Sequence, residues 1–141
     1  MVAQPAYPAV MVAGTPNAVF VRQVVPSRPN WVSSTAEDEA RRVEPWPLPA
    51  SNDPAPMLAE LIGEQPRTRI VEQTAERVRS VFVSLVFRFR DDVEFVIGQD
   101  RIDVLSASRV GHSDLGVNRR RVESLRREWV DRVAKLSPTD G

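Results

Sequence analysis

Between residues 67 and 106, apolar residues either alternate with polar ones or occupy nearly every position in four successive runs. A period of two residues, with many β-branched and aromatic side chains, predicts β-strands. The breaks between the runs are short, which favours neighbouring antiparallel strands joined as a meander. Residues 81–87, VFVSLVF, are apolar on both faces, so we expect them to form the most buried strand. The four runs are TRIVEQTA, VRSVFVSLVF, DVEFVIG and RIDVLS.

Two segments that flank these strands have apolar residues at helical spacing. Asp53 can cap the first helix with Pro54 in its first turn. The second helix is expected at about residues 117–136, and its apolar stripe consists of Val122, Leu125, Trp129, Val133 and Leu136. Its other face carries Arg120, Arg121, Arg127 and Asp131.

Upstream of both helices, the prolines of VEPWPLP at residues 43–49 restrict this stretch to a short edge strand. The order is then strand, helix, four strands, helix. This order predicts an α+β two-layer sandwich, with an antiparallel sheet of about four to five strands and two helices.

The N-terminal part of the chain has a different character, because ten of the twelve prolines fall within the first 56 residues. We therefore expect residues 1–42 to form an extended Pro-rich arm and residues 43–137 to form a single α+β domain. The arm is too apolar for a typical disordered tail, so it is expected to cover its own domain or a partner protein. We favour a partner, with candidate contact residues Tyr7, Val10, Met11, Val19, Phe20 and Val21.

Composition narrows the classes of function. Nineteen basic residues balance nineteen acidic ones, so no global field favours nucleic acid. The absence of cysteine excludes disulfides and thiolate metal sites. No apolar run is long enough to span a bilayer, and the N-terminus lacks the basic region of a signal peptide. We expect a cytoplasmic protein, with peripheral attachment to a membrane complex left open, and no cofactor.

Residues 106–121, SASRVGHSDLGVNRRR, concentrate most of the candidate chemistry. Two glycines at a strand-to-helix junction can expose backbone N–H groups, and the arginines can hold a carboxylate or phosphate. The candidate anion or ligand contacts are Arg109, His112, Ser113, Asp114, Asn118 and Arg119. In the other interpretation, which we favour, the arginines pair internally with acidic residues and lock the loop against the sheet. The candidates for that structural network are Asp91, Asp92, Ser106 and Ser108.

No complete catalytic set is evident, so no catalytic residue is assigned. His112 is the single histidine, and no Gly-x-Ser-x-Gly elbow accompanies it. Asp91, Asp92 and Glu94 are the best carboxylates for a metal, but alternation along a strand separates neighbouring side chains, and we expect no metal.

Four segments resemble the family catalogued as domain of unknown function 1499, over about residues 29–129. They are PNWVSS at 29–34, VEPW at 43–46, FRFRDDVEF at 87–95 and IDVLSASRVGHSDLGVNRRRVESL at 102–125. The resemblance implies a fold and the location of a site, but no reaction, because no activity is established for the family. Trp31 and Leu105 depart from its pattern, which commonly has cysteine and arginine at these positions. The family also often carries an N-terminal export signal or membrane anchor, where this chain has the Pro-rich arm.

Together these features favour a non-catalytic binding or accessory subunit whose arm docks on a larger protein assembly, one that could be associated with a membrane. The alternative is an enzyme or small-anion-binding protein that uses the 106–121 loop.

Overall fold

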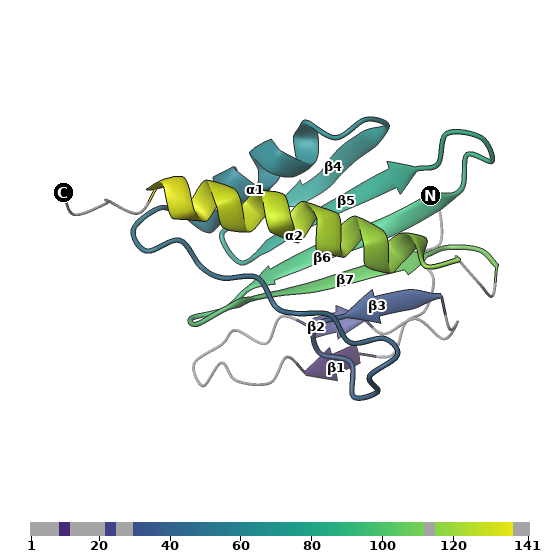
Figure 1. The fold of residues 1–141 in the computed structure, drawn as a ribbon, viewed down its shortest axis with the longest axis horizontal. Coiled ribbons are helices and arrows are strands. Elements are labelled where there is room, and N and C mark those ends of the chain that lie inside the picture. Colours follow the sequence, from purple (N-terminus) through teal and green to yellow (C-terminus); the bar gives the residue numbers. More distant parts are fainter. Residues whose placement is uncertain (1–8, 12–21, 25–29, 112–114, 137–141) are drawn as a thin grey trace.

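A computed structural model describes residues 9–11, 22–24, 30–111 and 115–136 of the chain. It confirms the predicted α+β fold, with a five-stranded antiparallel sheet and two helices (Figure 1). The sheet has the strand order β3-β7-β6-β5-β4. Its strands are β3 (Trp31–Ser33), β4 (Thr68–Gln73), β5 (Arg77–Val83), β6 (Arg90–Ile97) and β7 (Ile102–Ser108). A separate pair, β1 (Ala9–Met11) and β2 (Arg22–Val24), is antiparallel.

Strands β4 to β7 form the predicted meander, in which each strand pairs with the next one along the chain. The register between β6 and β7 runs from Asp91 opposite Ser108 to Ile97 opposite Ile102. Directly opposite residues share a face of the sheet, so alternation along β7 assigns its side chains to two faces. Ser106 and Ser108 point to one face, while Leu105 and Ala107 point to the other.

Both helices cover the face of the sheet that carries Ser106 (Figure 1). Helix α1 (Pro54–Gly63) packs on β4 and β5, and α2 (Val117–Leu136) packs on β7 and β3. Asp53 caps α1, since its carboxylate accepts a hydrogen bond from the Ala55 backbone N–H at 3.3 Å. We call the other side of the sheet the helix-free face.

The core lies between the helices and the sheet and contains two tryptophans. The Trp46 ring is 4.6 Å from that of Phe95 and 6.0 Å from that of Trp129. Trp129 also donates from its indole N–H to the Pro47 carbonyl at 2.8 Å, which anchors α2 to the chain before α1. No helix in the described part of the chain is long and apolar enough to cross a membrane.

Four details differ from the sequence predictions. The sheet edge beside β7 is formed by β3, a strand that the sequence pattern did not predict. VEPWPLP forms no strand, and only Trp46 makes an isolated bridge to Ile102. The strand in which every residue is buried is β7 and not the VFVSLVF run, which leaves the sheet after Val83.

The fourth difference concerns the start of the third strand, because the run DVEFVIG begins only at Asp92 whereas β6 begins at Arg90. Asp91 and Asp92 lie within β6 and therefore point to opposite faces of the sheet.

Candidate functional site

One end of the sheet brings three connecting segments together. Arg67, just before β4, accepts a hydrogen bond at its carbonyl from Val83 N–H at the end of β5, at 2.9 Å. Arg109, just after β7, donates from its backbone N–H to the Arg90 carbonyl at the start of β6, at 3.1 Å. The β5–β6 hairpin therefore lies between the α1–β4 and β7–α2 connections. We call this the hairpin end of the sheet.

A cleft of about 380 Å³ opens on the helix-free face at the hairpin end. Its lining contains five guanidinium groups and no carboxylate. The lining residues are Arg67, Thr68, Arg69, Val81, Val83, Arg88, Arg90 and Arg109. Five positive charges around one small hollow repel one another, so an anion in the cleft would relieve that repulsion. We call this hollow the arginine cleft.

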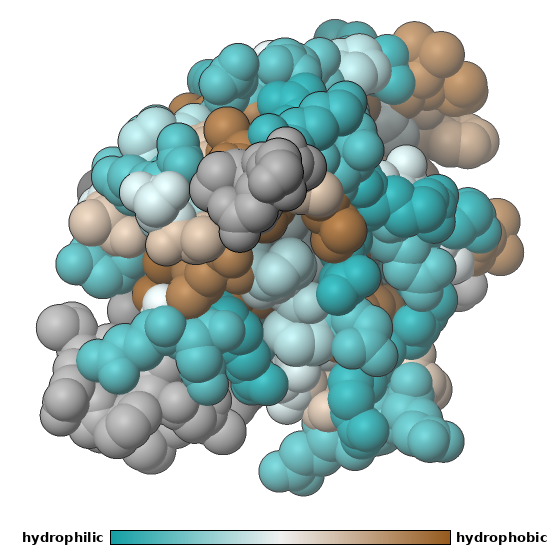
Figure 2. All heavy atoms as spheres, turned by 60° about the vertical axis from the view of Figure 1, so that its left-hand side comes forward, coloured by the Kyte–Doolittle hydropathy of each residue, from teal (hydrophilic) through white to brown (hydrophobic). Residues whose placement is uncertain are grey.

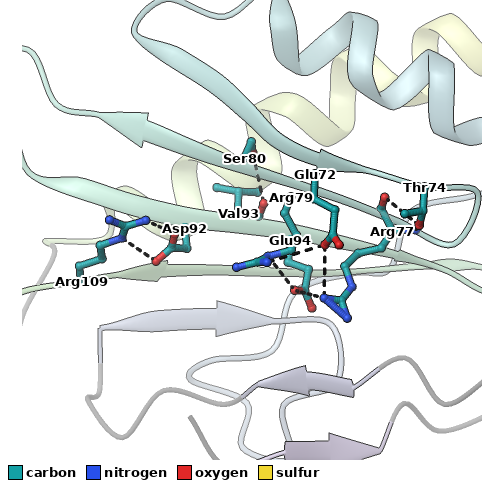
Figure 3. A network of polar contacts seen from close by, with 9 residues as sticks. All are labelled: Glu72, Thr74, Arg77, Arg79, Ser80, Asp92, Val93, Glu94 and Arg109. Atoms are coloured by element: carbon teal, nitrogen blue, oxygen red, sulfur yellow. Dashed lines mark hydrogen bonds and ion pairs between the residues drawn. The ribbon is translucent and has the colours of Figure 1, made fainter. Parts of the chain in front are cut away.

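The five arginines differ in how their side chains are already engaged. Arg109 holds Asp92 in a bidentate ion pair, with N–O distances of 2.9 and 2.8 Å (Figure 3). Arg67 donates from Nε to the Val83 carbonyl at 3.1 Å. In the described part of the chain, the guanidinium groups of Arg69, Arg88 and Arg90 form no hydrogen bond or ion pair. These three groups are available to a ligand.

Two residues of the cleft have an unusual backbone conformation. Arg67 and Arg88 have φ angles of 52° and 57°, in the left-handed region that non-glycine residues rarely adopt. Each such residue costs on the order of 1 kcal/mol or more, and such strain clusters at functional sites. Leu115, at the same end of the sheet, has a φ of 54°.

On the opposite face, a buried polar network joins the strands to α2. Arg121 forms an ion pair with Asp91 at 2.7 Å, and these side chains are only 13% and 8% exposed. The same guanidinium donates to Ser106 Oγ at 3.2 Å and to Asn118 Oδ1 at 3.0 Å, and it lies 4.9 Å from the Phe82 ring centroid. Arg121 thus faces the sheet, although the helical pattern assigned it to the outer face.

Asn118 and Asn30 extend this network to β3. Asn118 accepts a hydrogen bond from Ser106 Oγ at 2.6 Å and donates to Ser108 Oγ at 2.9 Å and to the Asn30 carbonyl at 3.1 Å. The Asn30 side chain donates to the carbonyls of Val110 and Gly111 at 2.7 and 3.0 Å. Three of the segments that carry the family resemblance therefore meet here, and they hold one another in place.

A second charged cluster crosses the helix-free face, further along the strands (Figure 3). Glu72 and Glu94 face Arg77 and Arg79, with four N–O distances between 3.4 and 3.9 Å. Burial raises the pKa of Glu94, and the charges of Arg77 and Arg79 offset only part of this rise. These two arginines already have acidic partners, whereas, among the described residues, Arg69, Arg88 and Arg90 of the arginine cleft have none.

The three described members of the predicted ligand set, Arg109, Asn118 and Arg119, lie in different places. Arg109 lines the arginine cleft, whereas Asn118 belongs to the buried network on the other face. Arg119 donates to the carbonyls of Arg42 and Ala40 at 3.1 and 2.7 Å, so it fastens residues 40–42 to α2. His112, Ser113 and Asp114 lie outside the described residues.

The residues proposed for the structural network divide between the two faces. Ser106, Ser108 and Asp91 are in the buried network, while Asp92 pairs with Arg109 at the arginine cleft. Of the arm residues proposed to contact a partner, Val10 and Met11 lie in β1, opposite β2. Tyr7, Val19, Phe20 and Val21 lie outside the described residues.

Sequence reasoning missed four of the five arginines of the cleft: Arg67, Arg69, Arg88 and Arg90. The segment FRFR at 87–90 was a usable signal, because it places two arginines, Arg88 and Arg90, at the end of a strand. Across the described residues, no group of three or more histidine, aspartate or glutamate side chains could hold a metal ion.

Comparison with known proteins identifies a family but no characterised relative. The model of the family described as "Protein of unknown function (DUF1499)" matches residues 23–129. No curated protein and no solved structure matches the chain. Because the family model covers most of the chain, the protein belongs to the DUF1499 family.

Proposed function

We propose that the protein binds a small oxyanion, a phosphate or carboxylate compound, in the arginine cleft. One observation carries this proposal: five arginines and no acidic residue line a single cleft. Planar guanidinium groups match carboxylate and phosphate oxygens in bidentate geometry, and such charge-assisted hydrogen bonds are stronger than neutral ones. A volume of about 380 Å³ is within the range of small-ligand sites.

Asp92 reduces the positive charge of the arginine cleft. It neutralises Arg109 from one side and leaves Arg69, Arg88 and Arg90 to carry the binding. Val81 and Val83 in the lining lower the local dielectric, which strengthens each contact between an arginine and an anion. Arginine keeps its charge at all accessible pH values, so binding should follow the protonation of the ligand and not that of the site.

The function proposed is binding rather than catalysis. Thr68 supplies the single hydroxyl group among the lining residues, and this hydroxyl donates to the Pro66 carbonyl at 3.0 Å. Nucleophilic catalysis needs a base next to the attacking group. Arginine cannot serve as that base, since it stays protonated.

Titration calorimetry with pyrophosphate and with citrate tests the proposal and distinguishes phosphate from carboxylate ligands. Arg69→Gln and Arg90→Gln should each weaken binding about tenfold or more, since a hydrogen bond to a charged group contributes about 1.5–3 kcal/mol. Arg127→Gln is the matched control, because Arg127 lies on α2 away from the arginine cleft. If both ligands fail to bind, or if the control loses as much affinity as the cleft variants, the proposal is wrong.

A second proposal concerns the N-terminal arm, as an element by which an accessory subunit docks on a larger assembly. Its support is the sequence, which combines prolines with apolar side chains before residue 29. Removing residues 1–28 should release a stoichiometric partner in pull-downs and leave oxyanion binding unchanged. Retention of that partner by the truncated chain would contradict the docking role.

A further inference from the structure

Exposed apolar side chains are concentrated at the hairpin end of the sheet. Of the ten large hydrophobic residues that are exposed in the described part of the chain, seven are in the β5–β6 hairpin, in the β7–α2 connection or at the first residue of α2. They are Leu85, Val86, Phe87, Phe89, Val110, Leu115 and Val117. The other three, Val71, Val130 and Leu136, are dispersed along β4 and α2.

The hairpin presents these side chains on a projection and not in a groove. It extends beyond the end of the sheet (Figure 1), and its four apolar side chains are between 50% and 76% exposed. The loop is nevertheless well defined, because Ser84 N–H donates to the Phe89 carbonyl and Phe89 N–H donates to Ser84 Oγ, both at 2.9 Å. The Phe87 and Phe89 rings stack with centroids 5.4 Å apart. We call residues 85–89 the apolar tip.

The neighbouring connection adds to the same surface. Arg109 N–H bonds to the Arg90 carbonyl, so Phe89 and Val110 lie one residue beyond the last paired positions of adjacent strands. Leu115 follows at the start of the turn into α2, and Arg120 donates to its carbonyl at 2.8 Å. By contrast, the connections at the other end of the sheet contain Glu76, Gln99 and Asp100 and no exposed large hydrophobic residue.

Positive charge surrounds this apolar surface. Arg88 is within the tip, and Arg67, Arg90 and Arg120 flank it. Among the described residues, two acidic side chains at the start of β6 lie near this surface, Asp91 and Asp92, and each is held by an arginine. The face in Figure 2, where the left-hand side of Figure 1 comes forward, is mostly hydrophilic, with apolar residues in separate patches.

We propose that the hairpin end is a membrane-docking surface, in which the apolar tip inserts into the interfacial region of an anionic lipid bilayer while the surrounding arginines contact lipid phosphates. A projecting apolar loop can enter the boundary between headgroups and acyl chains without any rearrangement of the sheet. Basic residues near the surface of an anionic leaflet each contribute about 1 kcal/mol, which is about fivefold in affinity. This proposal shares Arg67, Arg88 and Arg90 with the arginine cleft, but the insertion of the apolar tip does not depend on a soluble ligand in that cleft.

The absence of cysteine allows a direct test on the full-length chain. Phe87→Cys and Gln99→Cys each provide one labelling position for an environment-sensitive fluorophore, at opposite ends of the sheet. With phosphatidylcholine vesicles that contain phosphatidylglycerol, the fluorophore at position 87 should shift its emission to shorter wavelength, and the one at position 99 should not. Vesicles of phosphatidylcholine alone should bind at least about fivefold more weakly.

Co-sedimentation with the same vesicles gives a second readout. The variant Leu85→Ser/Val86→Ser/Phe87→Ser should lose about tenfold or more in partitioning, because serine has little apolar surface to bury. Val71→Ser and Val130→Ser, at exposed apolar sites elsewhere, should bind like the unmodified chain. Equal emission shifts at positions 87 and 99, or no shift at either, would overturn the proposal. So would a dimer in vesicle-free ultracentrifugation that the triple variant abolishes, since a second copy would then cover the tip.

Discussion

Asp91 and Asp92 are adjacent in sequence, yet the sheet gives them very different consequences for stability. Asp91→Asn leaves Arg121 without its counter-ion in a site where the two side chains are 13% and 8% exposed. Breaking a buried pair by removing one charge costs about 3–5 kcal/mol. Arg121 keeps its contacts with Ser106, Asn118 and Phe82, so we expect a loss near the lower limit, about 3 kcal/mol.

Asp92→Asn is the matched control, because it makes the same chemical change one residue further along. The Arg109–Asp92 pair is 32% and 28% exposed, and pairs that remain accessible to solvent contribute at most about 1 kcal/mol. Urea denaturation followed by tryptophan fluorescence measures both values, since Trp46 and Trp129 are fully buried in the folded state. In thermal unfolding, we expect the midpoint of Asp91→Asn to fall by about 10 °C and that of Asp92→Asn by about 4 °C or less.

A loss for Asp91→Asn no greater than that for Asp92→Asn would refute the reasoning, because it would mean that the buried pair contributes no more than an accessible one. A further check is the double variant Asp91→Leu/Arg121→Met. With both charges removed, no uncompensated charge remains, so this variant should be more stable than Asp91→Asn alone.

Three further predictions follow from individual contacts. Burial in the folded state raises the pKa of Glu94 above its ordinary 4.5, so the protonated side chain contributes stability that is fully present below about pH 4.5 and is lost as pH rises through the raised pKa. Glu94→Gln should remove this loss of stability. Urea midpoints measured at acidic and at neutral pH would reveal the difference. Asp53→Ala should destabilise the protein by about 1 kcal/mol through loss of the α1 cap, whereas Asn52→Ala should change the urea midpoint little. Asp92→Asn removes the negative charge paired with Arg109 and should tighten pyrophosphate binding in calorimetry. Weaker binding would show that Asp92 positions Arg109 rather than competing with the ligand.

The local pattern of apolar and polar residues was sufficient to predict most of the helices and strands. Alternating apolar residues located β4, β5, β6 and β7, and Asp53 with Pro54 located the start of α1. The apolar stripe of α2 gave its bounds, Val117–Leu136. These signals are properties of a few neighbouring residues, so they can be read from the chain without knowledge of its partners.

Periodicity was less informative where the chain leaves a regular element. The VFVSLVF run looks uniformly buried, but Leu85, Val86 and Phe87 form an exposed hairpin tip. Nothing in the hydrophobic pattern indicates that a run of apolar residues stops being covered after Val83. That depends on where β6 begins to pair, at Arg90 opposite Val83.

The sequence by itself therefore determined β4 to β7, the two helices, their order along the chain and the family to which the chain belongs. Only the tertiary structure decided which arginine meets which acid and which arginines remain for a ligand. Arg109 and Arg121 are both near the same strand-to-helix junction, yet they pair on opposite faces of the sheet, with Asp92 and Asp91. Strand register and helix placement bring together Arg109 and Asp92, which are 17 positions apart, and Arg121 and Asp91, which are 30 positions apart. Such contacts between residues that are distant in sequence create both the buried network and the arginine cleft.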